Sequence, residues 1–386
     1  MSYDLTEEQI MMQDTVRRIA KEQLAPAAAE RDEKNEFAWD AKKILQENGL
    51  FACDFKEEHG GAAMGMVALA VATEEIARVC ASSAVILLAT ELGAMPIMLA
   101  GSEEQKNKWL PALASGEKLV AFGLTEPGAG SDAAGIRTRV VKEGSKYILN
   151  GTKLFISHAD VAEYICIAAV TDPEKPVHKG GLSVIVVEKG APGLSIGKHE
   201  DKMGVRGSTT CEIILEDCEV PAENILAQEG DGFHILMKTL DFTRTCVAAQ
   251  AVGIAQGALD FAVDYAKERR QFGKPIIKFQ GLNWMLADMD TQVEAARQLL
   301  YKTCAVLDKI PKDLSPVPKE AIRLSAMCKL FAAETAMKVT TDAVQILGGY
   351  GYVKEYPVER MMRDAKITQI YEGTSQIQKV LIASLL

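Results

Sequence analysis

Two long helical stripes in the second half of the chain restrict its fold more than any other feature. Apolar side chains recur at alternating steps of four and three along residues 247–265 and again along residues 282–300. This spacing puts them on one face of a long helix. A third helix is predicted over residues 318–347, ending at Gly348-Gly349. We therefore expect a C-terminal four-helix bundle, whose long apolar faces also favour association of subunits.

The two regions before the bundle differ from it and from each other. Residues 1–118 are helical in pattern, whereas residues 119–222 consist of β-rich runs separated by Gly and Pro. Within the second region, Asn150-Gly151 predicts a hairpin turn between residues 147–149 and 154–156. No alternation of strands and helices appears there, so a mostly antiparallel β domain is expected. The sequence thus predicts an α+β multidomain fold, with domains over residues 1–118, 119–222 and 223–386.

Composition excludes several classes of function. The net charge of −10 and the pI near 5.2 argue against a nucleic-acid-binding surface. The eight cysteines include no C-x-x-C pair, so we expect no metal centre and reduced, packed thiols. No signal segment is visible at the start, and Thr90 and Glu91 interrupt the longest apolar stretch, residues 84–100. We expect a cytoplasmic protein that does not insert into a membrane.

One carboxylate near the end of the chain is a candidate general base. Glu372 follows an apolar run and lies between Tyr371 and Gly373. Little water around a carboxylate raises its pKa and suits it to accept a proton. A Glu beside a Gly is also typical of a solvated turn, and the local pattern alone leaves both interpretations open.

Two further motifs suggest contacts with a phosphate-bearing cofactor. Residues 128–133 match a loose dinucleotide fingerprint, but Pro127 precedes them and strand-like sequence follows, which is wrong for a Rossmann unit. Residues 125–131 instead predict a tight turn with hydroxyls and accessible backbone donors, or simply a glycine-rich surface turn. A dense cationic group over residues 267–275 either compensates a helix dipole or binds phosphate.

These stretches, in this order, resemble the acyl-CoA dehydrogenase family over essentially the whole chain. The resemblance implies an FAD-dependent enzyme of fatty acid metabolism that converts an acyl-CoA thioester to the 2-enoyl-CoA. It also implies a homotetramer that passes electrons to an electron-transfer flavoprotein. Glu372 would be the catalytic base, because Thr243 stands where the isovaleryl and long-chain branches of the family carry their glutamate.

The resemblance carries over a set of site residues. The implied cofactor contacts are Phe122, Leu124, Thr125, Gly130, Ser131, Phe155, Ile156, Ser157, Arg269, Gln271, Phe272, Gln280, Gln345, Gly348, Gly349, Thr374 and Gln376. Phe155 stands where the family often has Trp, and it could equally be a core residue. The segment 345–351 resembles the one that covers the adenosine part of FAD from a neighbouring subunit. The implied substrate contacts are Ser131, Asp241, Arg244, Tyr371 and Gly373.

The acyl group is less constrained. The motifs are closest to those of bacterial short-chain, butyryl-CoA-type members, with a pocket floor around residues 87–93. Glu91 is unexpectedly polar there: it faces solvent or a partner helix, or it shapes the pocket for a compact cyclic group such as cyclohexanecarboxyl-CoA. No Arg lies between Arg78 and Arg137, which disfavours a dicarboxylic substrate. Two competing functions are an acyl-CoA oxidase, usually a longer protein, and a non-catalytic scaffold of the same fold, expected to lack the Glu372 base.

Overall fold

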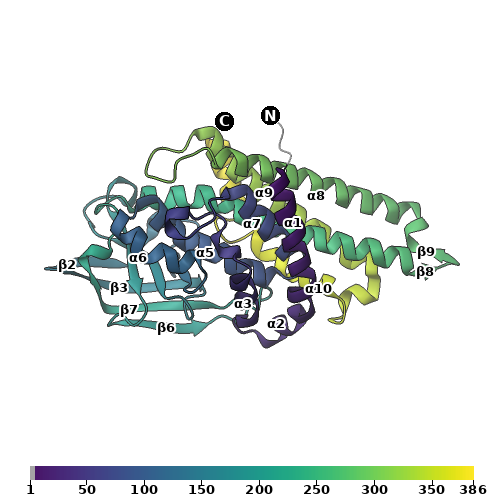
Figure 1. Ribbon diagram of the computed structural model, residues 1–386, viewed down its shortest axis with the longest axis horizontal. Helices are drawn as coiled ribbons and strands as arrows, with labels where there is room; N and C mark the ends of the chain where they lie inside the picture. The colour runs from purple at the N-terminus through teal and green to yellow at the C-terminus, as the bar shows by residue number, and fades with distance from the viewer. Residues whose placement is uncertain (1–4) are drawn as a thin grey trace.

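The computed structural model describes residues 5–386 of the protein. In Figure 1 the sheet lies at one end, the N-terminal helices lie in the middle, and the C-terminal helices extend to the opposite end. The N-terminal helices are α1 (Glu7–Ile19), α2 (Ala28–Lys34), α3 (Trp39–Glu47), α4 (Gly65–Ala77), α5 (Ala81–Ala100) and α6 (Glu103–Ala114).

Helices α4 and α5 form the centre of the molecule. Nearly every residue of both is buried, because α4 packs on α7 and α5 packs between α7 and the sheet. Helices α5 and α7 are long and apolar enough to cross a membrane by length and composition alone, but 94% and 78% of their apolar windows are buried within the protein. Both are therefore accounted for as core helices of the fold.

The β domain is a seven-stranded sheet. Its strands are β1 (Val120–Gly123), β2 (Arg139–Glu143), β3 (Lys146–Ser157), β4 (Tyr164–Val170), β5 (Leu182–Glu188), β6 (Leu194–His199) and β7 (Thr210–Pro221). The order is β1-β4-β2-β3-β7-β6, with β5 also paired to β4. The pairing is mostly antiparallel, as expected, although β1 and β2 both run parallel to β4. One face of the sheet has its own apolar cluster and the other packs on the helical core.

The prediction of a hairpin turn at Asn150-Gly151 is wrong. Strand β3 runs straight through both residues, and its pairing with β7 shifts register there. Gly151 allows a close approach, since a Cβ would lie 2.5 Å from the Thr138 hydroxyl oxygen, and Asn150 bonds to Asp217 on β7. The dipeptide thus marks a β-bulge, for which Gly serves as well as it does in a turn. The actual turn is at Gly144, between β2 and β3.

The C-terminal helices confirm the predicted stripes. They are α7 (Gly232–Glu268), α8 (Gln280–Leu307), α9 (Lys319–Leu347), α10 (Pro357–Thr368) and α11 (Ser375–Ser384), with a short hairpin of β8 (Arg270–Gln271) and β9 (Lys274–Pro275) after α7. The α7 stripe is buried against α4, α5 and α9 as far as Ala258, and its last members, Phe261 and Tyr265, are partly buried. The far ends of α7 and α8, with the β8–β9 hairpin, extend beyond the rest of the protein (Figure 1).

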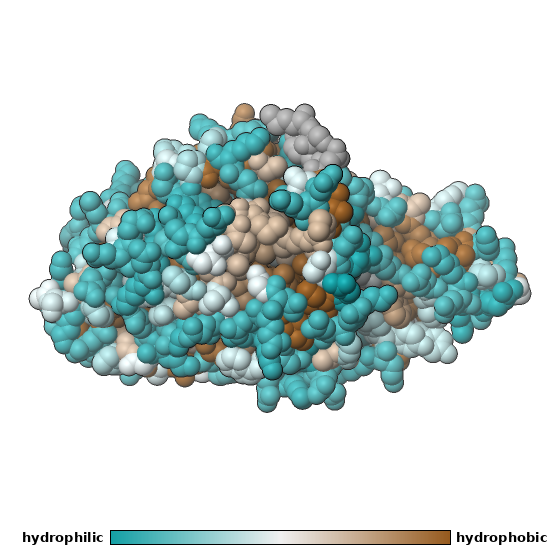
Figure 2. Space-filling model, viewed as in Figure 1, coloured by the Kyte–Doolittle hydropathy of each residue, from teal (hydrophilic) through white to brown (hydrophobic). Residues whose placement is uncertain are grey.

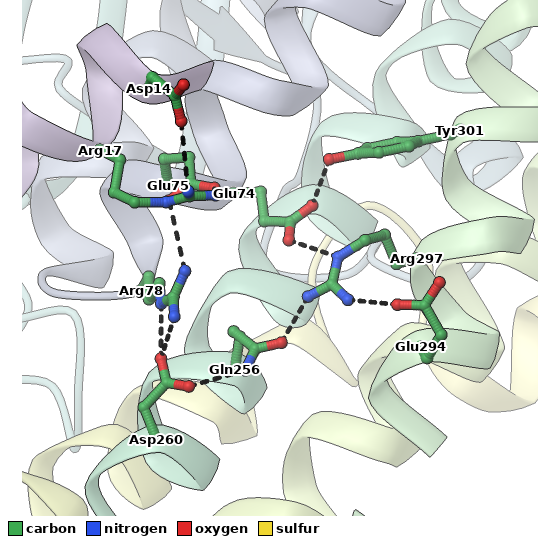
Figure 3. Close-up of polar contacts among 10 residues, drawn as sticks. All are labelled: Asp14, Arg17, Glu74, Glu75, Arg78, Gln256, Asp260, Glu294, Arg297 and Tyr301. Carbon is green, nitrogen blue, oxygen red and sulfur yellow. Dashed lines mark hydrogen bonds and ion pairs between the residues drawn. The ribbon is translucent and has the colours of Figure 1, made fainter. Parts of the chain in front are cut away.

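A polar network links the bundle to the N-terminal helices. Figure 3 shows Glu74 of α4 accepting hydrogen bonds from Arg297 Nε at 2.7 Å and from the Tyr301 hydroxyl at 2.8 Å. Next to it, Glu75 pairs with Arg17 of α1. Both carboxylates are almost fully buried, so removing one partner would leave an uncompensated charge. The network therefore fixes α4 against α1 and α8.

All eight cysteines are buried and free, as predicted from their spacing.

Figure 2 shows one face of the molecule. This face is mostly hydrophilic, with hydrophobic residues in its middle and along the extending helices. Two groups of potential metal ligands lie close together among residues 5–386, namely Asp160 with His199 and Cys211, and Glu58 with His59 and Glu103.

Candidate active site

A cavity of about 610 Å³ lies where the β domain meets the C-terminal tail. Many of the residues carried over from the resemblance meet there. From the β domain these are Thr125, Gly130, Ser131, Phe155 and Ser157, and from the tail Tyr371, Glu372, Gly373 and Thr374. Its volume is in the range of ligand-binding sites, and its lining combines apolar side chains with hydroxyl and charged groups.

The Glu372 carboxyl group is poorly hydrated. Its Oε2 accepts a hydrogen bond of 2.7 Å from the Thr243 hydroxyl of α7, whereas its Oε1 is enclosed and has no hydrogen-bond partner. Burial raises the pKa of Glu372 to about 7, although the Thr243 hydrogen bond and the charges of Lys329 and Arg244 lower it. A carboxyl group with a pKa near neutrality is suited to accept a proton at physiological pH.

Buried contacts fix the segment that precedes Glu372. The Tyr371 hydroxyl donates to the Gln250 side chain on α7. On α10, the buried Asp364 accepts a hydrogen bond of 2.6 Å from the Val205 amide, and burial raises the pKa of Asp364 to about 6. This bond ties α10 to the loop 200–208, which forms another wall of the cavity.

The turn after β1 is held by a side chain that sequence reasoning missed. The Glu126 carboxylate accepts hydrogen bonds from the amides of Arg137 and Thr138 and from Lys153 Nζ, at 2.6 to 2.9 Å. These bonds hold the turn that contains Glu126 in place, and the neighbouring Thr125 lines the cavity. A Glu inside a glycine-rich turn gave no sign of this role, because all partners of its carboxylate lie at least eleven residues away.

Phe155 presents an aromatic wall to the cavity. It is 62% exposed and has a left-handed backbone with φ of +57°, while Ile156 next to it is buried in the core of the sheet. The register of β3 against β7 shifts between Lys153 and Ile156, which allows this outward turn. An aromatic residue held exposed in a strained conformation fits a planar ring ligand such as a flavin. The hydroxyls of Thr125 and Ser157 beside it suit the polar edge of such a ring.

A second cavity of about 710 Å³ collects another group of the expected cofactor contacts. Arg269, Gln271, Phe272, Gln345, Gly348 and Gly349 line it. It lies by the β8–β9 hairpin, at the end of the molecule opposite the sheet (Figure 1). Phe272 is 93% exposed there. The two cavities of one chain are therefore separate sites in the fold.

Some expected contacts line neither cavity. These are Phe122, Leu124, Ile156, Asp241, Arg244, Gln280, Gln376 and Glu91. Asp241 and Arg244 form a buried ion pair of 2.6 Å, and the Arg244 Nε has no hydrogen-bond partner. Gln280 and Gln376 are exposed.

Glu91 lies in the interior of the protein. Only 2% of it is exposed, its Oε1 has no hydrogen-bond partner, and burial together with the neighbouring Asp54 raises its pKa well above the ordinary value. Asp54 in turn forms an ion pair with Lys312. Glu91 therefore faces a buried carboxylate and a lysine, and neither solvent nor the cavity that Glu372 lines.

The chain folds into a helical domain, a β domain and a second helical domain around one cavity. A buried carboxyl group and an exposed aromatic side chain line this cavity. Together these features indicate a flavoprotein that acts on carbon–hydrogen bonds. Three family models, described as the N-terminal, middle and C-terminal domains of acyl-CoA dehydrogenase, match residues 6–117, 121–218 and 230–386. The chain belongs to the acyl-CoA dehydrogenase family, whose members are flavin-dependent oxidoreductases acting on CH–CH bonds. Its cofactor is FAD.

Individual relatives cover the full chain. A short-chain-specific acyl-CoA dehydrogenase of Clostridium acetobutylicum is 48% identical over 99% of both proteins. A cyclohex-1-ene-1-carbonyl-CoA dehydrogenase of Geobacter metallireducens is 49% identical over 97% of both. A chain in a structure described as the electron-transferring flavoprotein of Acidaminococcus fermentans superposes with a TM-score of 0.95 at 47% identity, covering 100% of both chains.

Proposed function

We propose that the protein removes the α-proton of a short-chain acyl-CoA thioester with Glu372 and releases the 2-enoyl-CoA. The observation that carries this proposal is the enclosed, unpartnered Oε1 of Glu372 at the wall of the cavity. The α-carbon beside a thioester carbonyl is a weak acid, so its proton needs a carboxylate with little water around it. Glu372 meets this need, since Thr243 orients one oxygen and leaves the other free.

The FAD ring, when bound, supplies the acceptor for the hydride that leaves the β-carbon. We propose that Phe155, Thr125, Ser131 and Ser157 hold this ring, with Thr374 from the tail. The Glu372 backbone N–H, with a ribityl hydroxyl of the cofactor, would bind the thioester carbonyl oxygen, which gains charge as the proton leaves.

The second cavity supports a shared cofactor site between subunits. Its residues include Arg269 and Gln271, which suit a diphosphate, but they lie at the opposite end of the chain from Phe155. One cofactor molecule can use both sets only if a neighbouring subunit supplies one of them. Sharing the cofactor requires at least two subunits. Because a tetramer is typical of the family, we propose a homotetramer, in which segments 1–118 and 119–222 form the acyl and flavin pockets and segment 223–386 carries the base and the subunit contacts.

The electron acceptor is proposed to be an electron-transfer flavoprotein, in the cytoplasm. This chain is similar to a chain in the structure described as the electron-transferring flavoprotein of Acidaminococcus fermentans, and this similarity supports an electron-transfer flavoprotein as the acceptor. An acyl-CoA oxidase would instead pass electrons to oxygen. Peroxide measured under air during turnover, with and without the flavoprotein, separates the two functions.

A cyclic acyl-CoA is the second candidate substrate, favoured by the 49% identity to the Geobacter enzyme. Glu91 would then shape the pocket from behind its lining. Replacing Glu91 by Ser or Ala should change the preference between butyryl-CoA and cyclohexanecarboxyl-CoA. An unchanged substrate profile eliminates this role of Glu91.

Anaerobic bleaching of the flavin is the test of the whole proposal. The purified protein should be yellow and lose its flavin absorbance on addition of butyryl-CoA, and Glu372→Gln should not. The same assay with straight, branched and cyclic acyl-CoAs ranks the substrates. A yellow protein that no acyl-CoA bleaches would contradict the proposal and favour a non-catalytic scaffold.

A further inference from the structure

Lys329 of α9 is a buried lysine beside the candidate base. Its side chain is 0% exposed, and Nζ donates a hydrogen bond of 2.7 Å to the carbonyl oxygen of Gly373. No other hydrogen bond of Lys329 is found among residues 5–386. Burying an ammonium group is costly unless it has compensating partners. Lys329 is therefore expected to have a specific role at Gly373, the residue that follows Glu372.

The carbonyl that Lys329 binds belongs to a strained turn. Glu372 and Gly373 are both left-handed, with φ of +51° and +89°. A left-handed conformation is unfavourable for a non-glycine residue such as Glu372, so surrounding contacts must maintain it. Gln378 donates to the carbonyl oxygens of Glu372 and Gly373 at 3.1 and 2.9 Å, and Lys329 provides the third bond.

Lys329 also places a positive charge near Glu372, and no carboxylate accepts a hydrogen bond from its Nζ. Arg244, the other cation near Glu372, is already paired with Asp241 at 2.6 Å. Burial lowers the pKa of Lys329 to about 8, so the side chain is still mostly protonated at pH 7. The titratable and charged groups that face Glu372 or Lys329 are Asp241, Arg244, Cys246, Glu334 and Tyr371.

We propose that Lys329 is a positioning residue for the reaction: it holds the Glu372–Gly373 turn through the Gly373 carbonyl and places an unneutralised positive charge beside the base. The inference rests on the proposed function, because it assigns Lys329 a role through Glu372. Without this charge the ionised carboxylate is less favoured, so the pKa of Glu372 rises and less of it is ionised at pH 7.

Two substitutions separate the charge from the hydrogen bond. Lys329→Met removes both, and Lys329→Gln keeps an amide that can donate to the Gly373 carbonyl. Lys238 provides the matched control, since it is 1% exposed and its Nζ donates to the carbonyls of Pro311 and Ser315 at 3.0 and 2.7 Å. Nζ of Lys238 also lies 3.7 Å from an oxygen of the exposed Asp313. Lys238→Met thus removes a buried lysine that binds two backbone carbonyls and one exposed carboxylate, outside the cavity.

The measurement is the pH dependence of anaerobic flavin reduction by butyryl-CoA in the holoenzyme. In both Lys329 variants the midpoint should rise by about one pH unit, with about tenfold slower reduction at pH 6 and little change in KM. Lys238→Met should keep the wild-type midpoint. Infrared difference spectra between each protein and its Glu372→Gln form show the band of the protonated Glu372 carboxyl group without turnover. The pH midpoint at which this band disappears should rise by the same amount.

Each outcome decides the inference. Midpoints equal to that of the wild type in a folded Lys329→Gln protein, by both measurements, would overturn it. If Lys329→Met does not fold, Lys329→Gln alone still decides. A fully active Glu372→Gln enzyme would instead overturn the proposed function, which distinguishes the two failures.

Discussion

Replacing Glu372 by Gln should make the protein inactive and, above neutral pH, more stable. The pKa of Glu372 is about 7 in the folded protein, compared with 4.5 for an unperturbed glutamate. The folded state therefore binds a proton that the unfolded state releases over this range. The contribution of Glu372 to the stability of the fold is therefore largest below pH 4.5, falls as the pH rises from 4.5 to 7, and stays lower above pH 7.

The size of this effect follows from the pKa difference. Each pKa unit corresponds to about 1.4 kcal/mol, so ionising Glu372 costs the fold at most about 3.5 kcal/mol. Partial access of solvent to the carboxyl group reduces this value. A glutamine has the same shape, accepts the same hydrogen bond from Thr243, and does not ionise.

The assay compares thermal unfolding of the wild type and Glu372→Gln at pH 5 and pH 8, together with anaerobic flavin reduction. We expect Glu372→Gln to unfold at a Tm a few degrees higher at pH 8 and at nearly the same Tm at pH 5. Reduction by butyryl-CoA should slow by about 10²- to 10⁴-fold. Equal Tm differences at both pH values would show that Glu372 is not desolvated, and the reasoning would fail.

Three further results are expected. Thr243→Val removes the donor that lowers the pKa of Glu372, so the midpoint of the pH–rate profile should rise by about one unit. Glu74→Gln should lower the free energy of unfolding by at most about 3 kcal/mol in urea titrations, because it removes the buried carboxylate that pairs with Arg297 and leaves only the more exposed Glu294 as its ionic partner; a neutral effect would show that the network is not stabilising. Gly373→Ala forces a side chain onto a backbone with φ of +89°, so Tm and the rate of flavin reduction should both fall; an unchanged rate would mean that the turn does not position the base.

Local sequence determined the parts that depend on periodicity. The stripes over residues 247–265 and 282–300 predicted two of the bundle helices because burial of one helical face requires that spacing. The same logic failed at Asn150-Gly151, since a dipeptide that tolerates unusual backbone angles serves a bulge as well as a turn. Only the pairing of β3 with β7 decided between them.

The candidate site divides in the same way. Motifs placed Glu372 and Phe155 as candidates, because residue type and neighbours are visible along the chain. Lys329 and Glu126 gave no such signal, since each acts through partners distant in sequence. The poor hydration of Glu372 likewise arises from helices and loops that meet only in the folded protein. Tertiary structure therefore decided its ionisation, because pKa depends on what surrounds a group in space.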